Sequence, residues 1–211
     1  GLSPKEAAAI PLAGLTALQG LRDLGGLRPG HRVLITGATG GVGHFAVQIA
    51  AARGARVTAV CSAAKAELAR ELGADEVVDY AESPDYAALG PFDIIFDSVV
   101  KDPVGRLSPA LAEQGVLVST VPSIGNVARS MFWPLWSKKR ARHVMVSPRG
   151  RDLDELSALV AEGKLRAVVD SVYPLEDLGA AYAHSKEGHT TGKIVIEVCP
   201  ECVPPEQRPL T

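Results

Sequence analysis

The sequence predicts a doubly wound α/β domain, in which helices cover both faces of a parallel β-sheet. From residue 32 onwards, short apolar runs alternate with amphipathic stretches, which is typical of repeated strand–helix units. The runs are rich in Val and Ile and almost continuously apolar, as in FDIIF at residues 92–96. Continuous apolarity indicates strands that are buried on both faces of a sheet. We therefore expect a Rossmann-type sheet formed by residues 31–172.

The N-terminal residues predict a helix that precedes the sheet. Ser3 suits the N-cap, Pro4 suits the first helical position, and Glu6 completes a capping box. After Pro11 the helix is expected to restart and to run through Leu15, Leu18 and Leu21.

The remaining elements follow in alternation. Strands are expected at Arg32–Thr36, Arg56–Cys61, Glu76–Asp79, Phe92–Ser98, Gly115–Val121, His143–Ser147, Ala167–Val172 and Lys193–Val198. Helices are expected at Val42–Arg53, Ala63–Leu72, Pro103–Glu113, Arg151–Glu162 and Leu175–Lys186. This order divides the chain into a linking helix (1–30), a nucleotide-binding domain (31–172), a C-terminal helix and strand (173–198) and a Pro-rich tail (199–211).

Composition excludes several classes of protein. The 211 residues carry a formal net charge of −2, which argues against a nucleic-acid-binding surface. No apolar run approaches the roughly 18 residues that a membrane span needs, and the first residues do not resemble a signal peptide. Three cysteines cannot form a disulfide framework, so we expect a cytoplasmic protein.

A glycine-rich loop at residues 37–43 is the strongest functional signal. The segment VLITGATGGVG at residues 33–43 follows a predicted strand and opens a predicted helix. Glycines allow the backbone to turn tightly and approach a pyrophosphate, and the helix N-terminus offers free N–H groups. We therefore expect Gly37, Gly40, Gly41, Val42 and Gly43 to bind a dinucleotide.

The end of the second strand favours NADPH over NADH. NAD sites usually have an acidic residue here that binds the 2′-hydroxyl of the ribose. This strand instead ends in AVCSAAK at residues 59–65. Ser62 can donate a hydrogen bond to a 2′-phosphate, and Lys65 supplies a positive charge.

The chain resembles the medium-chain dehydrogenase/reductase superfamily, in its zinc-independent quinone oxidoreductase-like branch. Four segments carry the likeness: AAAIPLAGLTA at 7–17, GGVG at 40–43, ELGADEVVDY at 71–80 and GHTTGKIVI at 188–196. Together they cover nearly the whole chain to Val198. Members of this superfamily begin with a GroES-like catalytic domain, which is absent from these 211 residues. The resemblance leaves open whether the chain is part of a longer protein or a cofactor domain that needs a partner.

The resemblance also implies roles for individual residues. Tyr80 would join Ser62 and Lys65 around the 2′-phosphate, while Thr16, Ser98 and Thr120 would lie near the nicotinamide. Zinc-dependent relatives carry a ligand cysteine at the position of Leu12, and leucine cannot bind zinc, so no metal site is expected. The expected function is NADPH-dependent reduction of a quinone or an α,β-unsaturated carbonyl compound. No residue is assigned as the proton donor.

Two alternative functions remain open. Tyr182 and Lys186 match the Tyr-x-x-x-Lys pattern of short-chain dehydrogenases/reductases, in which the tyrosine transfers the proton. However, the Asn-Ala-Gly segment usual in that family is missing after residues 92–97. The chain is alternatively a non-catalytic NADPH-binding module.

Several weaker signals complete the analysis. Family resemblance implies a homodimer joined along the edge strand His143–Ser147, unless Arg140 and Arg142 prevent the edge from pairing. Cys199 and Cys202 are interpreted as a free thiol pair. The Lys101-Asp102 pair is interpreted as solvated, and the segment with Trp133 and Trp136 as a loop that borders the substrate cleft.

Overall fold

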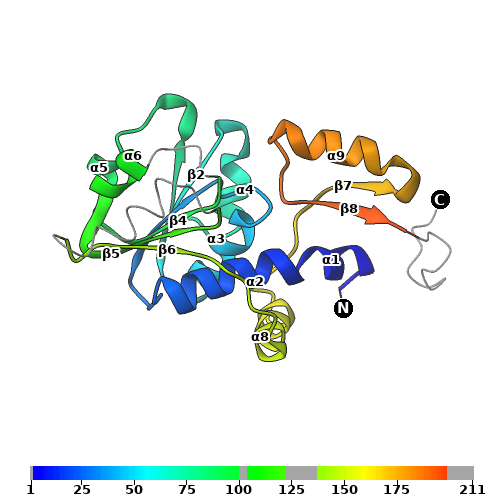
Figure 1. Ribbon diagram of the computed structural model, residues 1–211, viewed down its shortest axis with the longest axis horizontal. Coiled ribbons are helices and arrows are strands. Elements are labelled where there is room, and N and C mark those ends of the chain that lie inside the picture. Colours follow the sequence, from blue (N-terminus) through cyan, green and yellow to red (C-terminus); the bar gives the residue numbers. More distant parts are fainter. Residues whose placement is uncertain (1, 100–103, 122–136, 199–211) are drawn as a thin grey trace.

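The fold contains a six-stranded parallel sheet and a separate two-stranded sheet (Figure 1). The computed structural model describes residues 2–99, 104–121 and 137–198. The large sheet has the strand order β3-β2-β1-β4-β5-β6, and every neighbouring pair is parallel. The order reverses direction between β1 and β4, which is the arrangement of a doubly wound sheet. The predicted fold class is confirmed.

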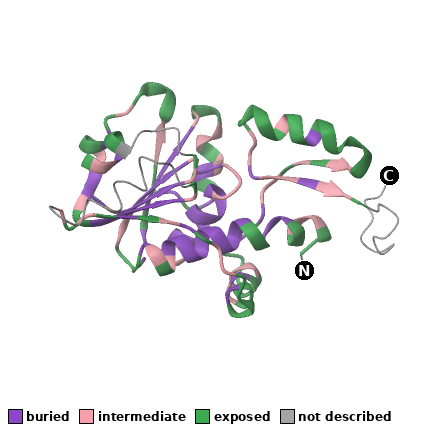
Figure 2. Cartoon of the chain, in the orientation of Figure 1, coloured by how far each residue is buried: buried purple, intermediate pink, exposed green. Residues whose placement is uncertain are grey.

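The strands have the following bounds. They are β1 (Arg32–Thr36), β2 (Arg56–Cys61), β3 (Glu76–Asp79), β4 (Phe92–Asp97), β5 (Leu111–Ser119) and β6 (Arg140–His143). Figure 2 shows that the central strands are buried along most of their length. Val33 and Ile35 of β1 belong to one apolar core, and Leu34 between them belongs to a second. Because successive side chains of a strand point to opposite faces, the sheet is packed on both sides.

Helices from different parts of the chain form the two cores. The first core is formed mainly with α2 (Pro11–Gln19), the π-helical turn η1 (Gly20–Leu24) and α3 (Gly43–Ala52). The second core includes side chains of α5 (Tyr86–Leu89) and of α6 (Val104–Leu107) with its 3-10 continuation η4 (Ser108–Ala110). The 3-10 turns η2 (Ala63–Lys65) and η3 (Tyr80–Glu82) follow β2 and β3, and α4 (Ala66–Glu71) continues η2.

The N-terminal prediction is confirmed in detail. Helix α1 (Pro4–Ala9) begins at a capping box, in which the Ser3 hydroxyl accepts from the amide of Glu6 and the Glu6 carboxylate accepts from the amide of Ser3. At the end of α2, Gly20 lies against the sheet, because an added Cβ there would be 2.6 Å from the Phe96 ring. A glycine at this position lets the helix pack closely on β4.

The strand predicted at Ala167–Val172 does not join the large sheet, which corrects the expected extent of that sheet. It forms β7 (Val169–Pro174), which pairs in parallel with β8 (Lys193–Glu197). Between them lie the 3-10 turn η6 (Leu175–Asp177) and α9 (Leu178–Glu187). We call residues 169–198 the small lobe and the remaining described residues the large lobe. Helix α1 lies beside the small lobe, with an ion pair of 3.2 Å between Lys5 and Glu197 (Figure 1).

Two further expectations are wrong in their boundaries. The edge strand β6 covers 140–143 rather than His143–Ser147, because Ser147 makes both of its backbone hydrogen bonds with the side chain of Gln19. The helix expected over Pro103–Glu113 ends at Ala110, and residues 111–113 belong to β5 instead. Pro109 lies in the 3-10 turn that ends this helix.

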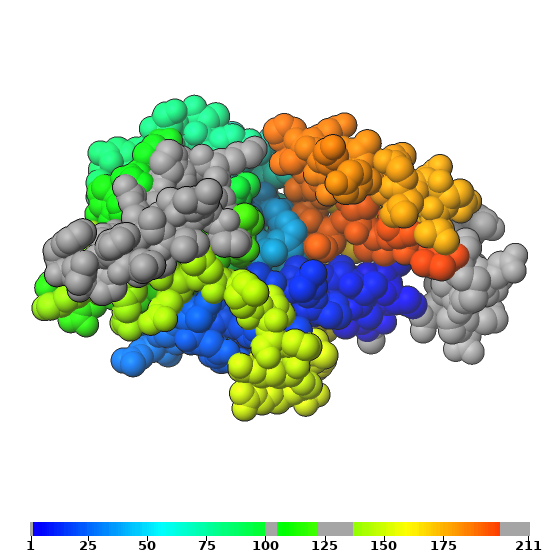
Figure 3. All heavy atoms as spheres, in the orientation of Figure 1, coloured from blue at the N-terminus to red at the C-terminus, as the bar shows by residue number. Residues whose placement is uncertain are grey.

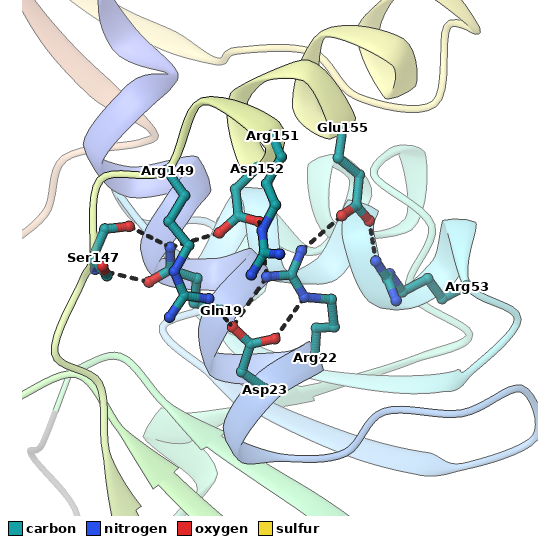
Figure 4. Close-up of polar contacts among 9 residues, drawn as sticks. All are labelled: Gln19, Arg22, Asp23, Arg53, Ser147, Arg149, Arg151, Asp152 and Glu155. Carbon is teal, nitrogen blue, oxygen red and sulfur yellow. Dashed lines mark hydrogen bonds and ion pairs between the residues drawn. The ribbon is translucent and has the colours of Figure 1, made fainter.

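A buried polar network attaches α8 (Gly150–Ala161) to the large lobe (Figure 4). The Asp152 carboxylate is 1% exposed and accepts hydrogen bonds from Gln19 Nε2 at 2.8 Å and from Arg22 Nη2 at 2.9 Å. Arg22 also binds Glu155 at 2.7 Å, and Glu155 forms a further ion pair with Arg53. Burial disfavours the charged form of Asp152, but the hydrogen bonds from Gln19 and Arg22 outweigh it and hold its pKa below the ordinary value.

Some predicted features lie outside the described residues. These are Lys101 and Asp102, Trp133 and Trp136, and the tail with Cys199 and Cys202. Within the described ranges, no helix is long and apolar enough to cross a membrane.

Candidate cofactor site

A cavity of about 520 Å³ lies at the carboxyl ends of β1, β2 and β4 and extends to the small lobe. Ligands of open α/β sheets bind at this edge, next to the point where the strand order reverses. Figure 3 shows the small lobe, in orange and red, beside the large lobe on this side of the molecule. Five parts of the chain line the cavity. They are the glycine loop (Thr36, Gly37, Thr39–Val42), the β2 end (Val60–Ser62, Lys65), Tyr80, the β4 end (Ser98, Val99) and the small lobe (Ser185, Gly188–Thr190, Gly192–Ile194).

The glycine loop is shaped by contacts that only glycine permits. Gly37 adopts a left-handed conformation with φ of +62°, and its carbonyl accepts from the amide of Gly40 at 2.9 Å. Helix α3 begins at Gly43, where an added Cβ would overlap the carbonyl of Gly37. The tight turn therefore brings the N-terminus of α3 to the cavity, where its free amides and positive dipole favour an anion.

A buried histidine in the first turn of α3 forms a hydrogen bond with the backbone of this loop. His44 is fully buried, and its Nδ1 lies 2.8 Å from the carbonyl oxygen of Gly40. A neutral imidazole with its proton on Nδ1 donates this hydrogen bond. Burial lowers the pKa of His44 to about 4, against a smaller opposing effect of the Gly40 bond, so the ring is neutral at physiological pH.

The end of β2 provides a cationic subsite. Ser62, Lys65 and Tyr80, which are expected to surround a 2′-phosphate, all line the cavity. Lys65 Nζ donates to the carbonyl oxygen of His189 at 2.5 Å. No acidic residue is among the described residues that line the cavity, which contrasts with two lysines. Cys61 is also part of this wall, and burial together with the nearby Asp79 raises the pKa of its thiol.

Hydrogen bonds connect the ends of β1 and β4. The Thr36 hydroxyl donates to the carboxylate of Asp97 at 2.6 Å, and the Ser98 hydroxyl donates to the carbonyl of Thr36 at 2.6 Å. Asp97 is buried, and these two hydrogen bonds hold Thr36 and Ser98 together at the edge of the sheet that faces the cavity. Ser98 itself lines the cavity.

Three predicted site residues do not line the cavity. The hydroxyl of Thr16 donates to the carbonyl of Leu12 within α2, and the amide of Thr120 donates to the carbonyl of Asp97. Gly43 packs against the carbonyl of Gly37 inside the loop and does not face the cavity. Sequence reasoning in turn missed the contribution of the small lobe, above all His189 and Lys193. These lie in the segment GHTTGKIVI, which the sequence analysis used only as a mark of resemblance.

The geometry does not support the short-chain dehydrogenase alternative. Tyr182 is 66% exposed on α9, and neither Tyr182 nor Lys186 lines the cavity. Lys186 Nζ instead lies 5.6 Å from the centre of the Tyr182 ring, which is a surface contact.

The strand order, the glycine loop and the cavity define a Rossmann-type dinucleotide-binding domain. The chain belongs to the zinc-binding dehydrogenase family, whose model matches residues 72–196. The predicted membership of the medium-chain dehydrogenase/reductase superfamily, in its quinone oxidoreductase-like branch, is confirmed. Among the described residues, no group of three His, Cys, Asp or Glu side chains is arranged to hold a metal ion.

Similar proteins are named as oxidoreductases. The chain is 40% identical to a chloroplast envelope quinone oxidoreductase homolog of Arabidopsis thaliana, over 91% of this chain and 61% of that protein. It is 34% identical to a human mitochondrial NAD(P)H oxidoreductase, over 93% and 56% of the two chains. Among solved structures, the quinone oxidoreductase of Coxiella burnetii aligns with a TM-score of 0.84 and 32% identity, covering 94% of this chain and 62% of that one.

The quinone oxidoreductase of Thermus thermophilus is a second structural relative. It has a TM-score of 0.72 and 34% identity, over 94% of this chain and 67% of that one, and was solved alone and with NADPH. The present chain thus spans about three fifths of the length of the curated relatives that it matches.

Proposed function

We propose that this chain is the cofactor-binding part of an NADPH-dependent oxidoreductase that reduces a quinone or an α,β-unsaturated carbonyl compound. The observation that carries the proposal is the cavity, which joins a glycine loop at a helix N-terminus to the Ser62–Lys65–Tyr80 subsite. NADPH, when bound, supplies a hydride to the electron-poor carbon of the substrate. The names of the relatives support this reaction class.

The residues of the chain fit a dinucleotide with a 2′-phosphate. Gly37, Gly40, Gly41 and Val42 provide the surface against which a pyrophosphate is expected, and Gly43 keeps that surface in place. Lys65 and Ser62 would bind the 2′-phosphate, because a phosphate binds more strongly to Lys65 than the neutral carbonyl of His189 does. Ser98, at the end of β4, would lie near the nicotinamide. Thr16 and Thr120 do not line the cavity, so they would act on the nicotinamide end of the site only by holding their own segments in place.

Binding measurements on the chain test the cofactor preference. Replacing Lys65 by Ala should weaken NADPH binding by about 1–3 kcal/mol, the range of a charge-assisted contact, and leave NADH binding nearly unchanged. Lys186→Ala, which removes a lysine outside the cavity, is the matched control. Equal losses for the two cofactors would refute the 2′-phosphate role of Lys65.

Turnover separates an enzyme from a non-catalytic NADPH-binding module. A small enone or a quinone is offered to the chain alone and to the chain joined to the upstream domain of a relative. NADPH oxidation that depends on the substrate supports the reductase. Binding of NADPH without turnover in both forms supports the module instead.

We also propose that two copies pair along the edge of the large sheet. The expected contact is at the β6 edge of the sheet, so it moves to residues 140–143 from 143–147 and places Arg140 and Arg142 at the interface. Pairing through a two-fold axis would satisfy the outer backbone groups of both strands. A protein that sediments as a monomer at micromolar concentration would overturn this proposal. The cytoplasmic location remains a prediction from cysteine usage, whereas the two curated relatives described above are named as a chloroplast envelope and a mitochondrial protein.

A further inference from the structure

A cluster of polar side chains lies inside the small lobe, between β7 and α9 (Figure 1). Oδ2 of Asp170, in β7, is 3.5 Å from Nε2 of His184, in α9. The Tyr173 hydroxyl lies 3.1 Å from Nδ1 of the same imidazole. The side chains of Asp170 and His184 are 18% and 30% exposed, so solvent screens their interaction only in part. None of the three residues lines the cavity, so the cluster is separate from the site described above.

The second carboxylate oxygen of Asp170 binds a segment that borders the cavity. We call residues 188–192 the wall segment, because all of them except Thr191 line the cavity. Asp170 Oδ1 accepts a hydrogen bond from the amide of Thr191 at 2.8 Å. The large lobe binds the same segment from the other side, where the amide of Gly192 donates to the carbonyl of Thr39 at 2.9 Å. Asp170 thus supports the wall segment from within the small lobe.

The cluster accommodates His184 in either protonation state. A neutral ring with its proton on Nε2 donates to Asp170, and its Nδ1 accepts from the Tyr173 hydroxyl. A protonated ring donates at both nitrogens, and the Tyr173 hydroxyl then accepts, because a hydroxyl group is both donor and acceptor. Protonation therefore breaks no contact of the cluster and places a positive charge beside the carboxylate of Asp170.

Asp170 is the charged group that faces His184. Tyr173 is the second titratable group in contact with the imidazole, and the Ser171 hydroxyl, at 3.4 Å from Nδ1, is the third polar neighbour. Within the described ranges, the other charged groups of the elements around His184 form no hydrogen bond or ion pair with it: Lys193 and Glu197 of β8, Glu176 and Asp177 of η6, and Lys186 and Glu187 of α9. A charge that His184 gains therefore acts first on Asp170.

We propose that Asp170 is a positioning residue of the cofactor site, which holds the wall segment in its binding position through Thr191. The inference rests on the proposed function and adds a regulation of the same site. Protonation of His184 strengthens its ion pair with Asp170, and the better-held carboxylate favours the bound position of the wall segment. Dinucleotide affinity should therefore rise as the pH falls from 8 to 6, the range in which histidine is the usual titrating side chain.

Amide hydrogen exchange in the ligand-free chain tests the positioning role without any cofactor. Asp170→Asn preserves the side-chain shape but replaces a charged acceptor of the Thr191 amide by a weaker neutral one. We expect the wall-segment amides to exchange about threefold faster or more, while exchange in β1 is unchanged and shows that the fold is intact. Glu176→Gln, which neutralises an exposed carboxylate of η6, is the matched control. Unchanged exchange of the wall segment in Asp170→Asn would overturn the inference.

Calorimetric titrations with NAD⁺ at pH 8 and pH 6 test the regulation. NAD⁺ has no 2′-phosphate, whose own charge would change near about pH 6. The wild type should bind NAD⁺ about two- to fivefold more tightly at pH 6, which is the effect of a partly exposed ion pair. His184→Gln should bind NAD⁺ equally at both pH values, because glutamine forms hydrogen bonds but gains no charge. Asp170→Asn should lose the pH difference as well.

A second histidine provides the control for this pH profile. His189 lines the cavity, so His189→Gln is compared with His184→Gln and should retain the difference between pH 6 and pH 8. His44, with a pKa of about 4, is neutral at both pH values. The inference is overturned if the wild type shows no pH difference, if the difference persists in His184→Gln, or if it disappears in His189→Gln.

Failure of the proposed function gives a different result. A wild-type chain that binds neither NAD⁺ nor NADP⁺ would overturn the proposed function, and amide exchange would still decide whether Asp170 holds the wall segment. If NADP⁺ alone binds, the same comparison is made with NADP⁺. Its 2′-phosphate titrates equally in the wild type and in His184→Gln, so a pH profile common to both proteins would overturn the role of His184.

Discussion

The buried carboxylate of Asp152 should contribute measurably to the stability of the fold, and Asp152→Asn tests this. The substitution preserves the shape of the side chain but removes the negative charge that Gln19 and Arg22 bind at 2.8 and 2.9 Å. Hydrogen bonds to a charged group contribute about 1.5–3 kcal/mol each. Relief of the cost of burying the charge offsets part of this loss, and Arg22 keeps Asp23 and Glu155 as partners.

The net cost of Asp152→Asn should therefore be about 2 kcal/mol at neutral pH. In a protein of this length, that corresponds to a fall in Tm of roughly 4–8 °C. The pKa of Asp152 is lower in the folded protein than in the unfolded chain. Its contribution is therefore complete above the unfolded pKa of about 4 and is lost as the pH falls through the folded value.

Urea unfolding of both proteins at several pH values measures this contribution. The difference between wild type and Asp152→Asn should be full at pH 7 and should narrow below about pH 4. Asp154→Asn is the control, because Asp154 is exposed on the same helix, and it should change stability by less than about 0.5 kcal/mol. Equal effects of the two substitutions at pH 7 would refute the reasoning.

Three further predictions concern other parts of the fold. The pKa of His44 is about 4 in the folded protein and near 6.5 in the unfolded chain, so the free energy of unfolding should decline by about 3 kcal/mol as the pH falls through this interval. Urea unfolding of His44→Gln over the same pH range should lack this decline. Gly43→Ala should abolish dinucleotide binding in calorimetry, because the added Cβ would overlap the Gly37 carbonyl. Gly179→Ala is the contrasting substitution, because it has open space within α9 and should raise the free energy of unfolding by about 0.5–1 kcal/mol. Ser3→Ala should cost about 0.5–2 kcal/mol in the stability of α1, seen as faster amide exchange there, and unchanged exchange would contradict the capping role.

The sequence predicted the central strands well because burial on both faces leaves a clear pattern. The bounds expected for residues 32–36 and 56–61 agree with β1 and β2. The edge strand β3 also has its expected bounds, 76–79, although its residues are only half-buried or exposed. The segment HVMVS at 143–147 has the composition of a strand, yet only His143 belongs to one. Val144 packs against Gly20 in the core, and Gln19 occupies the backbone groups of Ser147. A long-range side chain thus replaces a strand partner, which local patterns do not reveal.

The large-lobe part of the candidate site was predicted from its local motif, and the small-lobe part was not. Residues 37–43 carry their function in consecutive glycines, so the spacing itself is informative. His189 is 124 residues from Lys65 in sequence, and only the fold brings its carbonyl to the lysine. The place of Lys193 in the cavity was not predictable either, because a lysine at the start of a strand belongs to no local motif.

The two-stranded sheet of the small lobe has a consequence for how a ligand enters and leaves. Two parallel strands and one helix are marginal as an independent unit, whereas β1 lies at the centre of six strands. Sub-global opening of residues 169–198 should therefore need much less free energy than unfolding of the whole chain. Because this segment forms one wall of the cavity, its transient detachment would expose the glycine loop to solvent. The dissociation rate of a bound dinucleotide would then be limited by the rate at which residues 169–198 open. Amide hydrogen exchange in β8 measures that opening rate.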